Sequence, residues 1–502
     1  MLLFIPALST WSWIGLAVVA FLTWSVYQFI YDYYFHPLSH IPGPPLAFVP
    51  GYTLFRIFRG YSVFDLLEAH ENYGPVIRFS ATGISFADPA TEKQIYNSHS
   101  FVKDDTYKSY EWGYENSFST QVPSFSKKRR RMILPVFSAP NVARVEPLVY
   151  EVGVRATMNR WIKKYHAAAA AVTATTKTVS ETTVGSGLTD ANIGEGKGIV
   201  KHDSKMDMDL DGSNGAISSQ HTITVDLQSS FFEIFYNTIG RLSYGESFRM
   251  ADGLFNASTK AVDILQLMIE TEDSETGEKM SLDELVIESM IQMVAGTDTA
   301  GNTLSFTFDY LFANLSVLEK LEAEVLTAFP DPTERITYKA AKEKLPYLEA
   351  VLLESVRMRT VGGGYLPRVT PKGGRTIGGY FIPEGTIVGA SGYVKHNYSG
   401  LWEEPSVFRP ERFLEGAPPQ VLAERTQLIA PFAVGVRSCA GRQLAITEMI
   451  ITMAALVQHF EIRPAKLPHK LLNPTFVFVM GPRQKTLYAT VKPRHRYRTI
   501  PN

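Results

Sequence analysis

Hydrophobic positions form one uninterrupted run near the N-terminus and recur with helical spacing along most of the remaining chain. Residues 11–30 are almost wholly apolar, and no Asp, Glu, Lys or Arg precedes Asp32. About 20 helical residues span the hydrocarbon core of a bilayer, and Trp and Tyr residues flank the run as they flank membrane spans. We therefore predict a membrane anchor at residues 1–35. A cleaved signal peptide is the alternative, but no basic segment precedes the run and no small-residue cleavage site follows it.

Four prolines lie within residues 36–46, directly after the anchor. Proline fixes φ, lacks an N–H and restricts the residue before it, so the helix cannot continue through this segment. We predict a stiff, extended hinge there. Residues 47–502 are then expected to form one large domain.

The spacing of apolar residues in this domain predicts a mainly α fold with small β-sheets. Helices are expected at residues 142–165, 225–243, 281–315, 318–328 and 346–359, with another after residue 441. Short strands are expected in a hairpin at 75–87, at 375–381 and at 386–390, and in a C-terminal hairpin that joins 475–480 to 486–491.

Residues 166–222 differ from the rest of the chain. An alanine run is followed by a segment that is rich in Thr, Ser, Gly and Asp and has almost no aromatic residues. Such a composition buries too little apolar surface to offset the entropy of ordering. We predict a disordered insertion.

Composition narrows the functional classes. Hydrophobic residues make up 45% and charged residues 20% of the 502 residues, and the formal net charge is −1. These values are typical of a globular protein and give no reason to expect nucleic-acid binding. A single cysteine excludes an internal disulfide and any multi-cysteine zinc or iron–sulfur site, and it fits a reducing compartment.

That cysteine, Cys439, lies in residues 432–441, Phe-Ala-Val-Gly-Val-Arg-Ser-Cys-Ala-Gly. Gly435 permits a tight turn with positive φ, Arg437 supplies a cation for a carboxylate such as a porphyrin propionate, and Gly441 lets the backbone approach a flat ligand. A helix follows, so its N-terminus favours the deprotonated thiol. A buried free cysteine is the usual role of a lone Cys, but the surrounding residues favour a thiolate ligand of haem iron.

The same ten residues resemble the haem-binding loop of the cytochrome P-450 monooxygenases, Phe-x-x-Gly-x-Arg-x-Cys-x-Gly, at every specified position, Phe432 included. Three further strings follow in the family's order: the oxygen-activation motif Ala295-Gly296-Thr297-Asp298-Thr299, the Glu-x-x-Arg motif Glu354-Ser355-Val356-Arg357, and the segment Phe408-Arg409-Pro410-Glu411-Arg412-Phe413. The resemblance is close from about residue 264 to 494, to fungal, membrane-anchored members.

The resemblance implies haem b held by the thiolate of Cys439. It implies insertion of one oxygen atom from O2 into an apolar organic substrate by hydroxylation, epoxidation or demethylation, in secondary metabolism or xenobiotic oxidation. Electrons would come from NADPH through NADPH-cytochrome P-450 reductase, with cytochrome b5 as a further candidate, because the chain has no Gly-x-Gly-x-x-Gly loop of its own. The anchor would then hold a cytosolic catalytic domain on the endoplasmic reticulum membrane by a single span.

Two residues of the oxygen-activation motif are candidates for proton transfer. The Thr299 hydroxyl can donate, accept and hold a water, and Asp298 is a candidate carboxylic relay beside it. Thr299 can also bond the carbonyl of Ala295, four residues back. Without the cysteine loop, the same motif would be interpreted as part of a buried helix whose threonine hydroxyl bonds a backbone carbonyl of that helix.

The other motif residues are assigned by the resemblance. Glu354 and Arg357 share a helix face at i and i+3, and with Arg412 they would form a structural triad. Arg437, Arg368 and Arg130 would hold the haem propionates, although Ser126 stands where the family has a tryptophan partner for Arg130.

Residues 249–262 depart from the family pattern. Family members place several tens more residues here, in two long helices that cover the substrate pocket. We predict that these roof helices are truncated, either because the pocket is open or because coding sequence is missing. Two alternatives to a monooxygenase follow: a haem-thiolate isomerase or dehydratase, which Asp298 and Thr299 argue against, and a non-catalytic haem protein with an incomplete pocket.

Overall fold

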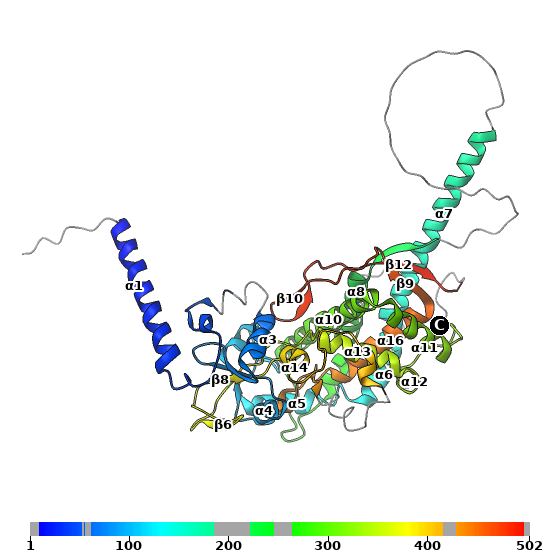
Figure 1. Cartoon of the computed structure of the whole chain (residues 1–502). Helices are drawn as coiled ribbons and strands as arrows, with labels where there is room; N and C mark the ends of the chain where they lie inside the picture. The colour runs from blue at the N-terminus through cyan, green and yellow to red at the C-terminus, as the bar shows by residue number, and fades with distance from the viewer. Residues whose placement is uncertain are drawn as a thin grey trace, which may run out of the picture.

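The computed structural model describes residues 10–52, 55, 62–184, 221–244, 264–414 and 428–495. The fold is mainly helical with small β-sheets, as predicted (Figure 1). The helices are α1 (Thr10–Ile30), α3 (Ser62–Tyr73), α4 (Pro89–Tyr96), α5 (Pro123–Ile133), α6 (Ala139–Val149), α7 (Ala156–Val184), α8 (Leu227–Tyr244), α9 (Ile264–Glu270), α10 (Leu282–Ala313), α11 (Leu315–Ala328), α12 (Tyr338–Lys344), α13 (Pro346–Met358), α14 (Gly392–Asn397) and α16 (Arg442–His459).

The strands are short and form four sheets. Their bounds are β1 (Val76–Arg78), β2 (Gly83–Phe86), β3 (Val102–Lys103), β4 (Ile223–Asp226), β5 (Arg368–Val369), β6 (Arg375–Ile377), β7 (Tyr380–Ile382), β8 (Ile387–Gly389), β9 (Phe460–Pro464), β10 (Pro474–Phe476), β11 (Met480–Pro482) and β12 (Tyr488–Pro493). The sheet orders are β1-β2-β8-β5-β3, β4-β12-β9, β10-β11 and β6-β7.

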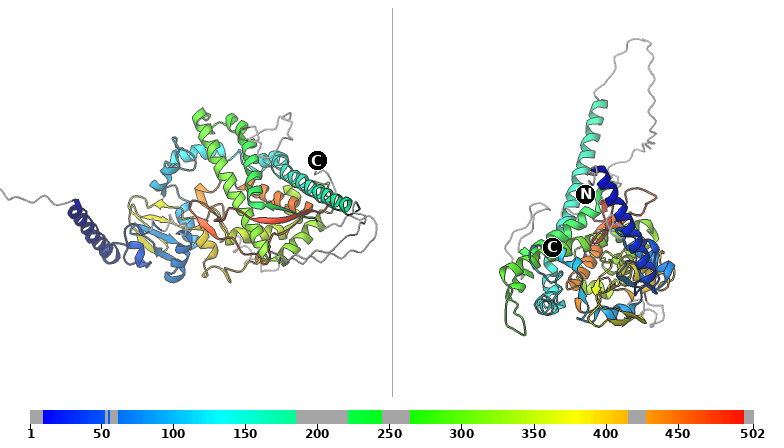
Figure 2. Two further views of the ribbon diagram at one scale, coloured as in Figure 1. Left: turned by 90° about the horizontal axis from the view of Figure 1, so that it is seen from above. Right: turned by 90° about the vertical axis from the view of Figure 1, so that its left-hand side faces the viewer.

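Helix α1 projects from the body of the molecule (Figure 1 and Figure 2). With the π-helical turn that follows, it forms a 26-residue apolar span, Thr10–Phe35, of mean hydropathy 1.7 with none of its 18-residue window buried. A helix of this length and composition is able to cross a membrane. The predicted anchor therefore corresponds to an exposed apolar helix that packs on no part of the body.

The proline-rich segment after the anchor is packed against the body. Leu38 and Ile41 are buried in the cluster that covers the five-stranded sheet, and the Arg78 N–H donates to the Pro42 carbonyl (2.8 Å). The Arg78 guanidinium also donates to the Asp32 carbonyl. We expected an extended hinge; the segment instead turns, because its two aliphatic side chains are buried.

Helix α10 is the longest described helix and runs through the body next to α8 (Figure 1). Ser281 and Glu284 form a capping box at its start, as their spacing favours. Glycines allow α8 to approach closely: a Cβ at Gly296 would lie 2.8 Å from the Ile239 side chain, and one at Gly301 would lie 2.8 Å from Phe232. Gly296 of the oxygen-activation motif therefore has a packing role against α8.

Two predicted elements differ in the structure. The second strand of the expected C-terminal hairpin, β12, pairs with β9 and β4, while β10 pairs with β11. Buried Ala489 and Val491 pack in the main core, and this long-range pairing is invisible in local sequence. Helix α7 continues to Val184, so the first part of the expected disordered insertion is helical. Residues 185–220 and 249–262, with the predicted roof truncation, lie outside the described residues.

The Glu354–Arg357–Arg412 triad is buried, with each side chain at most 1% exposed. Arg357 Nε donates to Glu354 Oε2 (2.8 Å) and Arg412 Nε to Glu354 Oε1 (3.0 Å). Both arginines also donate to carbonyls of residues 396–407. The triad therefore ties α13 to the segment that leads toward the cysteine loop.

Substitution Glu354→Ala should lower the free energy of unfolding by about 3–5 kcal/mol, because it leaves two guanidinium groups buried without their carboxylate. Urea denaturation of the purified protein measures this. The matched control is Lys279→Ala, which removes an exposed ion pair with Glu272 and should change the value by less than ~1 kcal/mol. Similar losses in the two variants would contradict the structural role of the triad.

Candidate active site

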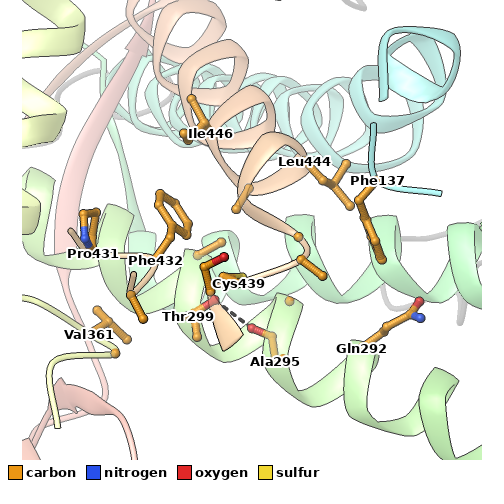
Figure 3. Close-up of a pocket in the computed structure, with 18 of the residues that line it drawn as sticks. Phe137, Gln292, Ala295, Thr299, Val361, Pro431, Phe432, Cys439, Leu444 and Ile446 are labelled. Atoms are coloured by element: carbon orange, nitrogen blue, oxygen red, sulfur yellow. Dashed lines mark hydrogen bonds between the residues drawn. The ribbon is translucent and has the colours of Figure 1, made fainter. Parts of the chain in front are cut away.

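A cavity of about 420 Å³ lies between α10, α16, α5 and the cysteine loop. Figure 3 shows Cys439 on the loop and Thr299 on α10, with Phe432 beside them. The predicted site residues that line this cavity are Thr299, Cys439, Arg437, Phe432, Gly441, Arg368 and Arg130. Residues that were far apart in the sequence therefore meet at one site.

The cysteine loop turns back on itself before α16 begins. The Cys439 N–H donates to the Phe432 carbonyl (2.9 Å) and the Ser438 N–H to the Gly435 carbonyl (3.1 Å). Gly435 has φ +80°, and a Cβ there would lie 2.1 Å from the Tyr96 carbonyl oxygen, so only glycine fits. The loop presents the Cys439 thiol, which is accessible from the cavity although it lies well inside the molecule.

The thiol does not have the lowered pKa that we expected from the nearby helix. Burial raises the pKa of Cys439, while the Gly441 N–H and the guanidinium groups of Arg130 and Arg442 act in the opposite direction with smaller effect. Helix α16 begins only at Arg442, so its N-terminus is offset from the sulfur. A bound metal cation would act in the opposite direction, because it deprotonates a thiol that coordinates it.

Thr299 and Asp298 lie on different faces of α10. The Thr299 hydroxyl donates to the Ala295 carbonyl (2.7 Å), as expected, and its side chain faces the cavity with Cys439 (Figure 3). Asp298 is absent from the described residues that line this cavity and instead lines a second one with Lys485. Burial raises the pKa of Asp298, and Lys485 partly opposes this.

Four cationic side chains surround one side of the cavity: Lys103, Arg130, Arg368 and Arg437. No ion pair joins any of them to a carboxylate within the described part of the chain. Arg130 Nη1 donates to the Ser438 carbonyl (2.8 Å) and Arg368 Nη1 to the Pro367 carbonyl (2.8 Å). Arg437 Nη1 is buried without a hydrogen-bond partner.

This cluster of like charges fits a dianionic ligand. Burial, with repulsion from Arg368 and Arg130, lowers the pKa of Arg437 to about 10, and the same causes lower the pKa of Lys103 well below its usual value. Buried charges in proteins are normally paired, so the cluster lacks an anion. Gly441 adds space: a Cβ there would meet nothing within 4 Å. A flat group with two carboxylates and a metal for Cys439 matches these features.

Sequence reasoning missed two residues of the cavity. Lys103, in β3, donates to the Phe118 carbonyl and lies 4.3 Å from the Tyr107 ring centroid, but a single lysine in a two-residue strand carries no local signal. Glu288 accepts hydrogen bonds from the Ser117 N–H (2.8 Å) and hydroxyl (2.6 Å). It lies on the same predicted helix as the oxygen-activation motif but outside the motif, so the sequence gave only weak evidence that it lines the cavity.

The site and fold together define a haem-thiolate protein. The family model described as Cytochrome P450 matches residues 254–488. Relatives match over more of the chain. Cytochrome P450 monooxygenase helB1 of Aspergillus fumigatus is 26% identical, covering 91% of this chain and 80% of its own length. BipB of Cochliobolus sativus is 27% identical, covering 86% and 87%, and macH of Penicillium terrestre is 27% identical, covering 89% and 92%.

The family model covers residues 254–488 and the relatives cover most of the chain, so the chain is similar to the cytochrome P450 family. It is therefore a monooxygenase of the haem-thiolate class that uses haem b, dioxygen, an organic substrate and a redox partner. The suspected family and enzyme class are confirmed.

Substitution Arg437→Leu should have opposite effects on the haem-free and haem-loaded protein. Without haem, the thermal midpoint should rise, because a buried unpaired cation and its repulsion with Arg368 and Arg130 are removed. With haem, the rate of haem transfer to apomyoglobin should increase at least about tenfold, because a charge-assisted hydrogen bond worth about 1.5–3 kcal/mol is lost.

The control for this experiment is Lys127→Met, which removes an exposed cation from the neighbouring helix α5. It should change neither quantity. If Arg437→Leu instead stabilised both the haem-free and the haem-loaded protein, or destabilised both, the residue would have a structural role and no role in haem binding.

Proposed function

We propose that the Cys439 thiol would hold the haem iron and that Thr299 holds and moves protons in the same cavity. The observation that carries this proposal is that the only cysteine of the chain faces Thr299 across one cavity. When bound, the haem supplies the iron at which dioxygen is activated. Arg437, Arg368 and Arg130 bind its carboxylates, and Lys103 joins them.

Thr299 acts through its hydroxyl. Because the hydroxyl donates to the Ala295 carbonyl, its lone pairs face the cavity and can hold a water. That water can pass a proton without opening the apolar cavity to bulk solvent. Asp298 lies on another face of α10, so a relay role requires its side chain to exchange protons around the helix edge; burial raises its pKa above the ordinary value.

The cavity favours an apolar organic substrate. Beyond the cationic side, its walls include Ile239, Ile291, Val361 and Leu366, with Phe118 from the loop before α5. Oxidation of such a substrate by hydroxylation, epoxidation or demethylation fits this lining, and the names of the fungal relatives, all monooxygenases, support a role in secondary metabolism.

Electrons would come from NADPH through NADPH-cytochrome P450 reductase, with cytochrome b5 as a second candidate. The basic run 127–131 offers this partner less charge than its sequence suggests. Lys128 pairs with Glu278, Arg129 with Glu284, and Arg131 with Asp273, while Arg130 faces the cavity. Helix α1 would hold the domain on the cytosolic face of the endoplasmic reticulum membrane.

Substitution Thr299→Ala should uncouple NADPH use from oxygen insertion. Positioned proton transfer contributes about 10²–10⁴-fold, so the yield of ¹⁸O-labelled product from ¹⁸O₂ per NADPH should fall at least about tenfold, with hydrogen peroxide formed instead. The assay uses the reductase and a compound that the wild-type protein oxidises.

The matched control is Thr307→Val on the same helix. Thr307 makes the same type of bond, to the Thr303 carbonyl (2.9 Å), but is buried outside the cavity lining, so its loss should leave the coupling unchanged. Full coupling in Thr299→Ala would remove the proposed proton role, and label-free product from wild type would remove the monooxygenase reaction.

A further inference from the structure

A second cavity, of about 700 Å³, lies on the other face of α10 from the haem cavity. Helix α8, helix α10 and the β10–β11 hairpin enclose it, and Figure 1 shows these three elements side by side. Apart from the relay considered for Asp298, none of the roles assigned above involves residues of this cavity. Its lining residues on α10 are Thr297, Asp298 and Asn302, so it lies directly across the helix from Thr299.

The floor of this cavity holds polar groups without partners. Thr297 and Gln228 are each 6% exposed, and neither Thr297 Oγ1 nor Gln228 Oε1 has a hydrogen-bond partner. Other hydroxyls of α10 bond the carbonyl four residues back, as Thr299, Thr303, Ser305 and Thr307 do. The Thr297 hydroxyl makes no such bond, although the same helix offers it one.

The groups that need partners are mainly hydrogen-bond acceptors. Gln228 Oε1 can only accept, its amide donates over a long 3.5 Å to Asn302 Oδ1, and the Asp298 carboxylate is half-buried in the same wall. Buried polar groups are normally satisfied, so this floor calls for a ligand rich in N–H donors.

Charge and shape add to this requirement. The Asp298 carboxylate has no ion-pair partner within the described residues. Lys485 affects its pKa but lies beyond ion-pair distance. Glu233 is already paired with Arg160. Phe232 and Tyr236 of α8 supply aromatic faces, which attract cations, and Val477 and Val479 supply apolar surface.

We propose that this second cavity binds a small organic cation, one with N–H donors on an apolar or aromatic body, with its charge on Asp298 and its donors on Gln228 and Thr297. The site is separate from the haem cavity and does not depend on which reaction the haem performs. A ligand there would contact the residue that precedes Thr299, on the helix that the two cavities share.

Benzamidinium is a suitable probe, because it carries four N–H donors on an aromatic ring and has no free lone pair for haem iron. Isothermal titration of the full-length haem protein in detergent should show benzamidinium binding at least about tenfold more tightly than neutral benzamide or anionic benzoate, a difference of about 1.4 kcal/mol or more. Tighter binding of benzoate would mean that Lys485 dominates the site, and equal binding would mean that charge is irrelevant; either result overturns the proposal.

Two variants locate the cation. Asp298→Asn keeps the shape and should weaken benzamidinium at least about tenfold, and Thr297→Val should weaken it several-fold. Glu288→Gln, which alters the buried carboxylate of the haem cavity, is the matched control and should leave the affinity unchanged. Weaker binding in Glu288→Gln with unchanged affinity in Asp298→Asn would place the cation in the haem cavity and contradict the proposal.

A competition experiment tests, without substitutions, whether the cation binds outside the haem cavity. Imidazole at a concentration that saturates the haem iron, followed by the visible spectrum, should not change the affinity for benzamidinium. Loss of benzamidinium binding under imidazole would overturn the proposal even if the variants failed to fold.

Discussion

The structure depends on a concentration of buried positive charge that the polypeptide does not neutralise. Lys103, Arg130, Arg368 and Arg437 converge on one cavity without a carboxylate partner among the described residues, and one guanidinium nitrogen of Arg437 has no hydrogen-bond partner at all. By contrast, the buried guanidinium groups of Arg357 and Arg412 are paired with the Glu354 carboxylate. The contrast supports the proposal that haem carboxylates are the partners of these cations.

The same constraint explains the behaviour of Cys439. The loop that carries it is fixed by Gly435 against the Tyr96 carbonyl and by the bond from the Cys439 N–H to Phe432. Burial raises the pKa of the thiol, so the protein orients the sulfur without ionising it. In the proposed function, the cations would hold the haem carboxylates, and the haem iron would favour the deprotonated form of the thiol that the loop positions.

Sequence reasoning succeeded where the chemistry is local. The predicted helix at 281–315 corresponds to α10, and the pairing of Glu354 with Arg357 follows from their spacing on one helix. It failed where distant segments meet. Lys103 reaches the cavity only because β3 pairs with β5. Strand β12 pairs with β9, 25–33 residues away in sequence, and with β4, more than 260 residues away. The face on which Asp298 lies follows from how α8 packs on α10, which no local pattern specifies.

The ligand of the haem iron is the point that most needs measurement. We would record the carbon monoxide difference spectrum of the dithionite-reduced full-length protein beside that of Cys439→His. The account predicts that the wild-type protein shows the long-wavelength Soret band of thiolate ligation and that Cys439→His keeps haem but loses this band. A wild-type protein without haem, or one whose spectrum is that of a nitrogen ligand and is the same in both proteins, would contradict it.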